Sequence, residues 1–128
     1  MILESPSLLI TDDDLDFRDT LCSAFQSQGF RTLAASDGEE ALQIVQQEQV
    51  HLLLLDHHMP RLTGLETIRR LRALDSPAPC ILISAAVDDT IRQEAQRSNA
   101  FTVLAKPISF PDVTSAVHRA LKLIYNWP

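Results

Sequence analysis

Short apolar runs alternate along the chain with longer segments in which apolar residues recur every three or four positions. This alternation predicts strands separated by helices. The runs "HLLLLD" at 51–56 and "CILIS" at 80–84 have no regular polar positions, which is typical of parallel strands covered on both faces. In chain order, the predicted strands are residues 7–11, 30–35, 51–56, 80–84 and 101–105.

Helices are predicted in the intervening segments. Apolar residues four positions apart predict a helix over residues 15–28, which Gly29 would end. Ser36 and Glu39 have the spacing of a capping box, so a second helix should begin there. The segment 88–98 has a narrow apolar stripe and is expected to form a half-exposed helix. One further helix is expected to carry Leu65, Ile68, Leu71 and Arg72 up to the break at "DSPAP". The last helix is expected to have an apolar stripe that runs from Val113 to Ile124.

Five strand–helix units in strict alternation predict an α/β fold, a doubly wound parallel sheet with helices on both faces. Since no repeat or internal linker interrupts the pattern, we expect one domain over residues 1–128 with a core of about 7–125. In such sheets, ligands bind outside the carboxyl ends of the strands, where the strand order reverses. For the order 2-1-3-4-5, that reversal lies between the first and third strands.

The composition is that of an ordinary globular protein, with 45% apolar and 22% charged residues. A net charge of -6 disfavours direct binding to nucleic acid or to an anionic membrane. Glu4 and Pro6 interrupt the first apolar run, so a signal peptide is not expected, and no apolar run has the length of a membrane span. Cys22 and Cys80 are expected to be buried, reduced thiols, which fits a cytoplasmic location.

Every predicted strand except the second places a reactive or charged residue at the same edge, whereas the second ends in "AAS" with nothing strongly charged. The first strand leads into Asp12 and Asp13, the third ends in Asp56, the fourth ends in Ser84, and the fifth leads into Lys106. Carboxylates gathered at one edge of a sheet repel, by about 4 kcal/mol per pair at about 4 Å and an effective dielectric of about 20. Bound Mg²⁺ or Mn²⁺ would offset this repulsion, because carboxylate and water oxygens suit these ions.

Carboxylates, a metal ion, an ammonium group and a hydroxyl are the components used in phosphoryl transfer. A carboxylate can itself act as the nucleophile and form an aspartyl phosphate. The chain has only three glycines and no glycine-rich nucleotide loop, so a tightly bound nucleotide is not expected. The phosphoryl group should therefore arrive on a small donor or on another protein.

Four motifs, "LLITDDD", "LLLLDHHMPRLTGLE", "ILISA" and "LAKPI", occur in the order and at the spacing of a known family. Together they resemble the CheY-like receiver domain of two-component response regulators. The resemblance extends from Ser7 to about Tyr125. It implies a flavodoxin-like (βα)5 fold with the strand order 2-1-3-4-5.

The resemblance also implies roles for the acidic residues. Asp56 would be the phosphoacceptor and a metal ligand. Asp13 would bind Mg²⁺ or Mn²⁺ directly, and Asp12 would act on the metal mainly through water. The backbone carbonyl of His58 would be the third protein ligand of the metal.

Further positions match the family's switch. Ser84 stands where a hydroxyl hydrogen-bonds the phosphoryl group, and Lys106 stands where a lysine pairs with it. The Lys106–Pro107 peptide bond would be cis. The family usually has an aromatic residue three positions before the lysine, but this chain has Val103. An aromatic rotamer switch is therefore not expected, and a smaller rearrangement is left open.

His58 and Ala86 occupy the two positions that, by the resemblance, flank the phosphoryl group and tune its lifetime. A histidine there could orient or obstruct the attacking water. The implied phosphodonor is a sensor histidine kinase or a phosphotransfer protein, with small acyl phosphates as further donors. Readout is expected at the helix 88–98, the fifth strand and the last helix. An output domain, an effector protein and a homodimer are left open.

The same residues allow other interpretations. The main rival is a small phosphatase of the haloacid-dehalogenase type, because "DDD" satisfies its D-x-D arrangement after the first strand. Such enzymes need cap elements that this chain lacks. A flavodoxin-like binding module is disfavoured, because this chain has no Gly-rich or Ser/Thr-rich phosphate loop. A degenerate receiver that signals by protein contact alone is disfavoured, because all the site residues are present. Asp14 is expected to cap a helix. A zinc site at His51, His57 and His58 is disfavoured. Tyr125 and Trp127 are expected to pack at a helix end.

Overall fold

The computed structural model describes residues 5–128, in which strands and helices alternate. The strands are β1 (Ser7–Thr11), β2 (Arg31–Ala35), β3 (Leu52–Asp56), β4 (Cys80–Ser84) and β5 (Thr102–Ala105). The helices are α1 (Leu15–Ser27), α2 (Gly38–Gln47), α3 (Gly64–Ala73), α4 (Asp89–Arg97) and α5 (Phe110–Tyr125). Each observed strand end lies within one residue of its predicted position. Within residues 5–128, no helix combines the length and apolar character needed to cross a membrane.

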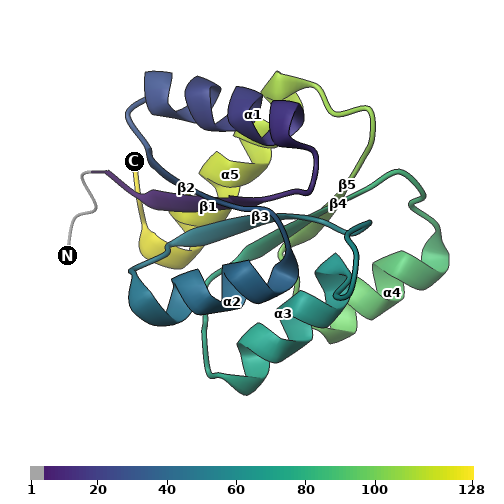
Figure 1. The fold of residues 1–128 in the computed structure, drawn as a ribbon. Coiled ribbons are helices and arrows are strands. Elements are labelled where there is room, and N and C mark those ends of the chain that lie inside the picture. The colour runs from purple at the N-terminus through teal and green to yellow at the C-terminus, as the bar shows by residue number, and fades with distance from the viewer. Residues whose placement is uncertain (1–4) are drawn as a thin grey trace.

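The strands form one parallel sheet in the order β2-β1-β3-β4-β5, which confirms the predicted fold class and topology. Its register pairs Thr11 with Ala35, Asp56 with Ile83, and Ser84 with Ala105. The carboxyl ends of all the strands therefore meet at one edge, on the right in Figure 1.

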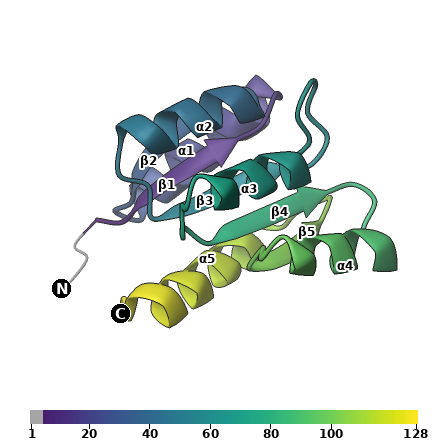
Figure 2. The ribbon, with the colours of Figure 1, turned by 90° about the horizontal axis from the view of Figure 1, so that it is seen from below.

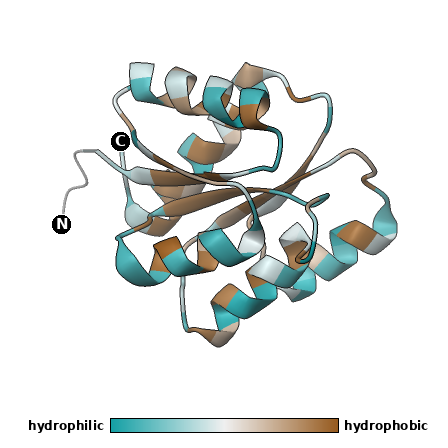
Figure 3. Cartoon of the chain, in the orientation of Figure 1, coloured by the Kyte–Doolittle hydropathy of each residue, from teal (hydrophilic) through white to brown (hydrophobic). Residues whose placement is uncertain are grey.

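Two apolar cores lie on opposite faces of this sheet. Helices α1 and α5 cover one face, and α2, α3 and α4 cover the other (Figures 1 and 2). Successive side chains of a strand point to opposite faces, so Leu52 and Leu54 enter the first core while Leu53 and Leu55 enter the second. Figure 3 shows the result, with apolar strands enclosed by helices that are polar on their outer sides. The uninterrupted leucine run of β3 is explained by this double burial.

The sequence prediction did not identify the residues that cap α2 and α5. The predicted capping box of Ser36 and Glu39 is not formed, so this prediction is wrong. The N-cap of α2 is Asp37, whose carboxylate accepts the Glu40 N–H at 2.8 Å. Arg61 pairs with the same carboxylate at 2.7 Å and holds it in place. Helix α5 begins three residues before Val113, the first residue of the predicted apolar stripe, because the Ser109 side chain caps its first turn.

The last turn of α5 also departs from the predicted apolar stripe. Ile124 was expected to be buried, yet it is 52% exposed, because Tyr125 occupies the side of the turn that faces the sheet. The Tyr125 hydroxyl donates to the His51 carbonyl at 2.7 Å. Trp127 packs on Phe30 with ring centroids 5.3 Å apart. Both aromatic residues serve helix-end packing, as predicted.

The cysteines are free thiols in different surroundings. Cys80 is fully buried in β4, and burial raises the pKa of its thiol to about 11. Cys22 in α1 is only partly buried, which corrects the expectation that both would be enclosed. Burial also raises the pKa of the Cys22 thiol.

His51 is a buried polar residue at the amino end of β3. Its Nδ1 accepts the backbone N–H of Ser7 at 2.9 Å, and its ring meets the Tyr125 ring edge-on at 5.4 Å. Burial lowers the pKa of His51, so the folded state favours the neutral imidazole. This side chain links the start of β1 to the end of α5.

Replacing His51 with Phe keeps a ring against Tyr125 but removes the acceptor for the Ser7 amide. At about pH 7.5 we expect the free energy of unfolding to fall by about 1–3 kcal/mol, the cost of an unsatisfied buried donor. Because the folded pKa of His51 is lowered, wild-type stability decreases as the pH falls below 6.5, and the variant lacks this dependence. In urea unfolding, the difference should shrink toward acid pH. A difference independent of pH would contradict this role for His51.

Candidate functional site

Three carboxylates from two strand ends meet at the carboxyl edge of the sheet. Oxygens of Asp12, Asp13 and Asp56 all lie within 4.8 Å of one another. Asp12 and Asp56 are each 2% exposed, whereas Asp13 is exposed to solvent. The Asp12 N–H donates to the carbonyl of Ala35 at 3.1 Å, which extends the pairing of β1 with β2 and fixes the backbone there. The predicted convergence of acidic side chains is therefore present.

Asp12 is buried with only part of its hydrogen-bonding capacity used. Its Oδ1 accepts the Asp14 N–H at 2.9 Å, but among the described residues its Oδ2 has no hydrogen-bond partner. Burial, with smaller contributions from the charges of Asp56 and Asp13, raises the pKa of Asp12 to about 6, against the lowering effects of the Asp14 N–H and Lys106. At neutral pH the negative charge of the ionised Asp12 carboxylate is therefore only partly balanced by nearby positive charge and hydrogen-bond donors.

Asp56 faces the lysine that follows β5. Lys106 Nζ lies 3.1 Å from Asp56 Oδ1, an ion pair without the angular geometry of a hydrogen bond. The Lys106 backbone N–H donates to the Ser84 carbonyl at 2.9 Å, and its ammonium lies 5.5 Å from the centre of the Phe17 ring. The Lys106–Pro107 peptide bond is cis, as predicted. One side-chain cation thus faces the carboxylates from the fifth strand.

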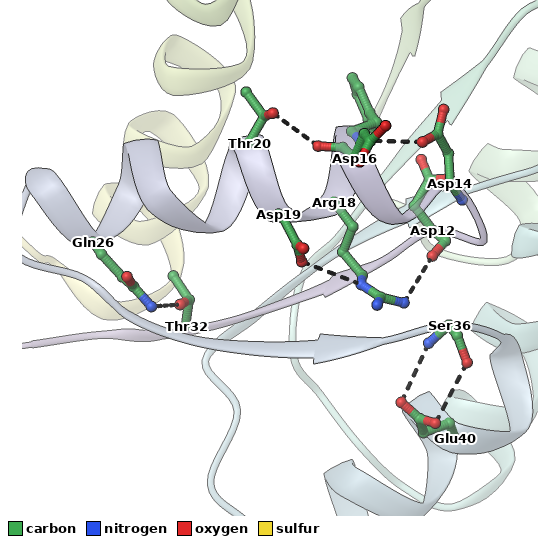
Figure 4. A network of polar contacts seen from close by, with 11 residues as sticks. Asp12, Asp14, Asp16, Arg18, Asp19, Thr20, Gln26, Thr32, Ser36 and Glu40 are labelled. Carbon is green, nitrogen blue, oxygen red and sulfur yellow. Dashed lines mark hydrogen bonds and ion pairs between the residues drawn. The ribbon is translucent and has the colours of Figure 1, made fainter.

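Arg18 is a second cation near this edge, and sequence reasoning missed it. Its guanidinium donates to the backbone carbonyl of Asp12 at 3.3 Å, and its Nε lies 4.0 Å from the Asp19 carboxylate (Figure 4). It therefore contacts the main chain rather than the buried carboxylate of Asp12. No spacing in the sequence signals this contact, because it depends on a side chain turning back from the first turn of α1.

The Ser84 hydroxyl is buried at the end of β4 and lies in a hydrogen-bonded arrangement with the neighbouring loops. Its Oγ lies 3.1 Å from His58 Nε2 and 3.2 Å from both the backbone nitrogen and oxygen of Ala86. Ala86 itself is exposed. Within residues 5–128, no hydrogen bond joins Ser84 to Asp56.

Close packing behind Asp56 holds the loop that follows it. A Cβ on Gly64 would lie 2.8 Å from the Asp56 carbonyl oxygen, so glycine is needed for this approach. The Gly64 N–H donates to the His57 carbonyl at 3.1 Å, and the His57 N–H donates to the Ile83 carbonyl at 2.8 Å. Burial, with a smaller effect from His58, lowers the pKa of His57. Sequence reasoning assigned His57 no role and missed Gly64, although a glycine soon after a buried strand is a signal for close backbone approach.

Val103 lies in β5 opposite Leu82 of β4 and is half-buried. It packs against the core on the face covered by α2, α3 and α4. Helix α4 is held in that core by only two buried side chains, those of Ile91 and Ala95, as the sequence predicted. The residue that replaces the family's aromatic residue is therefore in contact with the core that anchors α4.

The acidic edge fits a hard divalent cation. Asp12 Oδ2 and Asp56 Oδ1 are buried without hydrogen-bond partners in the part of the chain that the structure describes, and an Asp13 oxygen lies within the same 4.8 Å. Asp56 Oδ1 contacts the Lys106 ammonium, and both buried oxygens keep lone pairs for a ligand that prefers carboxylates and water.

Asp12→Asn tests whether the buried carboxylate is under electrostatic strain. A rise in pKa from 3.8 to about 6 corresponds to about 3 kcal/mol of destabilisation once the group is ionised. Because the folded pKa is raised, wild-type stability falls as the pH rises through this interval, and the variant lacks that loss.

We therefore expect Asp12→Asn to be more stable than the wild type by up to about 3 kcal/mol at neutral pH in a chelating buffer, and by little near pH 4. Chemical unfolding across this pH range is the measurement. Asp13→Asn is the matched control, and its exposed side chain should produce a smaller gain. A less stable Asp12→Asn protein at neutral pH would contradict the assigned strain.

The comparisons with known proteins agree with this geometry. The family model of the response regulator receiver domain matches residues 8–118. Sporulation initiation phosphotransferase F of Bacillus subtilis (strain 168) is 33% identical over 119 residues, covering 93% of this chain and 96% of that protein. Regulatory protein AtoC of Escherichia coli (strain K12) is 33% identical over 116 residues, covering 91% of this chain and 25% of that protein.

Solved structures show the same architecture. The response regulator protein TrrA from Thermotoga maritima, solved in complex with Mg²⁺–BeF, superposes with a TM-score of 0.80 at 28% identity. That match covers 91% of this chain and 99% of the TrrA chain. The family model alone matches most of the chain, from residue 8 to residue 118. The chain belongs to the receiver domain family of two-component response regulators.

Proposed function

We propose that Asp56 is the phosphoacceptor of this receiver domain. An Asp56 carboxylate oxygen attacks phosphorus in a phosphohistidine or acyl phosphate, and a new O–P bond forms. The donor's P–N or P–O bond breaks, and its electron pair leaves with the donor's histidine nitrogen or carboxylate oxygen. The donor is a sensor histidine kinase or a phosphotransfer protein.

The observation that supports Asp56 over its neighbours is its ion pair with Lys106. Asp56 is the acidic residue whose oxygen lies 3.1 Å from the ammonium, and that oxygen lacks a hydrogen-bond partner among the described residues. Asp14 is already used as the cap of α1, since it accepts the Phe17 N–H at 3.2 Å. Lys106 would remain beside the phosphoryl oxygens after transfer and would balance their charge.

The acidic edge would hold Mg²⁺, or Mn²⁺ in its place. Asp13 and Asp56 would be direct ligands with the backbone carbonyl of His58, and Asp12 would act mainly through water. When bound, the cation neutralises charge that develops on the phosphoryl oxygens. Without it, the same residues would leave Asp56 in a strongly negative field.

Phosphorylation would switch the domain through Ser84 and Lys106. A phosphoryl group adds about -1.5 to -2 charge and three acceptor oxygens at Asp56. Ser84 would move toward these oxygens, and the loop that contains Ala86 would follow. Only two buried side chains, those of Ile91 and Ala95, anchor α4, and Val103 packs against the same core. The movement of Ser84 and its loop would therefore alter the packing of α4, β5 and α5.

An open cleft of about 480 Å³ leaves Lys106 accessible beside Phe17, and Asp14, Pro107 and Ile108 complete its lining. Access of this kind supports delivery of the phosphoryl group by another protein. His58 and Ala86 would influence how long the aspartyl phosphate survives, and its hydrolysis would reset the switch. Self-phosphorylation and autodephosphorylation are the only reactions proposed for the domain itself.

The position of Asp14 also argues against the phosphatase alternative. A haloacid-dehalogenase-type enzyme would use the first and third residues of "DDD", which are Asp12 and Asp14. Asp12 is buried, and Asp14 caps a helix. The relatives found are response regulators rather than phosphatases. An output domain in the same protein is one form that the output could take, since this chain spans 25% of AtoC but 96% of sporulation initiation phosphotransferase F. An effector protein or a homodimer would be alternative outputs.

Asp56→Asn should abolish labelling, because an amide cannot act as the phosphoacceptor. Wild type incubated with acetyl phosphate and Mg²⁺ should gain one phosphate by intact mass, and the adduct should be labile to base. Asp14→Asn is the control and should be labelled like the wild type. Equal labelling of Asp56→Asn and wild type would show that the assigned acceptor is wrong.

Mg²⁺ should stabilise the unphosphorylated domain through the acidic edge. A ligand at ten times its dissociation constant adds about 1.4 kcal/mol to the free energy of unfolding. Thermal unfolding should show this gain for wild type and for Asp14→Asn, and most of it should be lost in Asp13→Asn. The same gain in wild type and Asp13→Asn would exclude Asp13 as a ligand.

A further inference from the structure

His58 connects the loop after β3 to the end of β4. Its Nε2 lies 3.1 Å from Ser84 Oγ, although the two residues are 26 positions apart in the sequence. Ser84 is fully buried, whereas His58 is exposed. An imidazole that borders solvent therefore contacts the buried hydroxyl that the switch would use.

The Ser84 hydroxyl has one proton and two lone pairs to distribute. Its oxygen accepts the Ala86 N–H at 3.2 Å, and the Ala86 carbonyl is at the same distance. If the hydroxyl donates to the Ala86 carbonyl, His58 donates its Nε2–H to the oxygen. If the hydroxyl donates to His58 Nε2, its only proton is committed to the ring. In either arrangement the proton or a lone pair is engaged away from Asp56.

The backbone around His58 is fixed on both sides, so the imidazole starts from a defined position. On one side, the His57 N–H is bonded to the Ile83 carbonyl at 2.8 Å. On the other, Met59 is 7% exposed and packs in the core, and its N–H donates to the His57 carbonyl at 3.2 Å. Contact with Ser84 therefore requires little further ordering of the loop.

We infer that the His58 imidazole is a latch that holds the Ser84 hydroxyl in its unphosphorylated arrangement. The inference rests on the proposed function, because the latch opposes the movement of Ser84 toward a phosphoryl group on Asp56. Ser84 must exchange its contact with His58 for one with the phosphoryl oxygens. His58 is thus a positioning residue that biases the equilibrium between the two states through Ser84.

Loss of the latch should favour the phosphorylated arrangement. A single hydrogen bond changes an equilibrium by roughly three- to tenfold. His58→Phe keeps a planar ring and removes the nitrogen that contacts Ser84. Beryllofluoride is a stable substitute for the phosphoryl group. In the presence of Mg²⁺, the affinity of His58→Phe for beryllofluoride should exceed that of the wild type by roughly three- to tenfold.

A double-mutant cycle separates the latch from other effects of the substitution. In Ser84→Ala the latch has no partner, so adding His58→Phe should leave the beryllofluoride affinity unchanged. Calorimetric titration of the four proteins measures the coupling. The same gain in both backgrounds, or a loss of affinity in His58→Phe, would overturn the latch. His58→Leu serves in place of His58→Phe if that protein does not fold.

An observation on the unliganded protein distinguishes this inference from the proposed function. Ser84→Ala should shift the imidazole nitrogen resonance of His58 in ¹⁵N NMR spectra, and His57 should change less. An unchanged His58 resonance would overturn the latch, whatever binds at Asp56. If the wild type binds no beryllofluoride while His58 responds to Ser84→Ala, the proposed function fails and the ground-state contact stands.

Discussion

Incompletely compensated negative charge at one edge of the sheet is the constraint on which the site depends. Parallel strands place their carboxyl ends together, so Asp12, Asp13 and Asp56 meet although 43 positions separate Asp13 from Asp56 in the sequence. Lys106 approaches from β5, and Arg18 is turned toward the main chain. The carboxylates thus remain short of positive charge. An edge of this kind attracts a divalent cation and favours chemistry in which oxygen charge is spread over a phosphoryl group.

Burial of the apolar strands offsets the repulsion between these carboxylates. β1, β3 and β4 are buried along their whole length, between α1 and α5 on one face and α2, α3 and α4 on the other. That burial stabilises a framework rigid enough to hold like charges close together. Strand β5 is less buried, and α4 has a narrow contact with the core. The parts nearest Ser84 and Lys106 are therefore also the parts that can shift at the lowest cost.

Sequence patterns predicted the features that follow from strand direction and burial. The alternating elements, the edge where Asp12, Asp56 and Lys106 meet, and the capping role of Asp14 all depend on local pattern and chain direction. The choice of Asp37 over Ser36 as a cap could not be predicted in the same way, because Arg61 reaches Asp37 from a distant loop. The contacts of Arg18 and of Ser84 with His58 likewise depend on side-chain direction in the folded molecule. Residue spacing contains no information about those directions.

A carboxyl ¹³C NMR titration of Asp12, with and without Mg²⁺, measures the uncompensated charge at this edge of the sheet. In the absence of the cation Asp12 should have a pKa of about 6, because the carboxylate is buried and lies beside Asp56 and Asp13. In the presence of Mg²⁺ its pKa should be clearly lower, since a bound cation favours the ionised form. An Asp12 pKa at the ordinary value of 3.8 that does not respond to Mg²⁺ would show that the edge carries no such uncompensated charge.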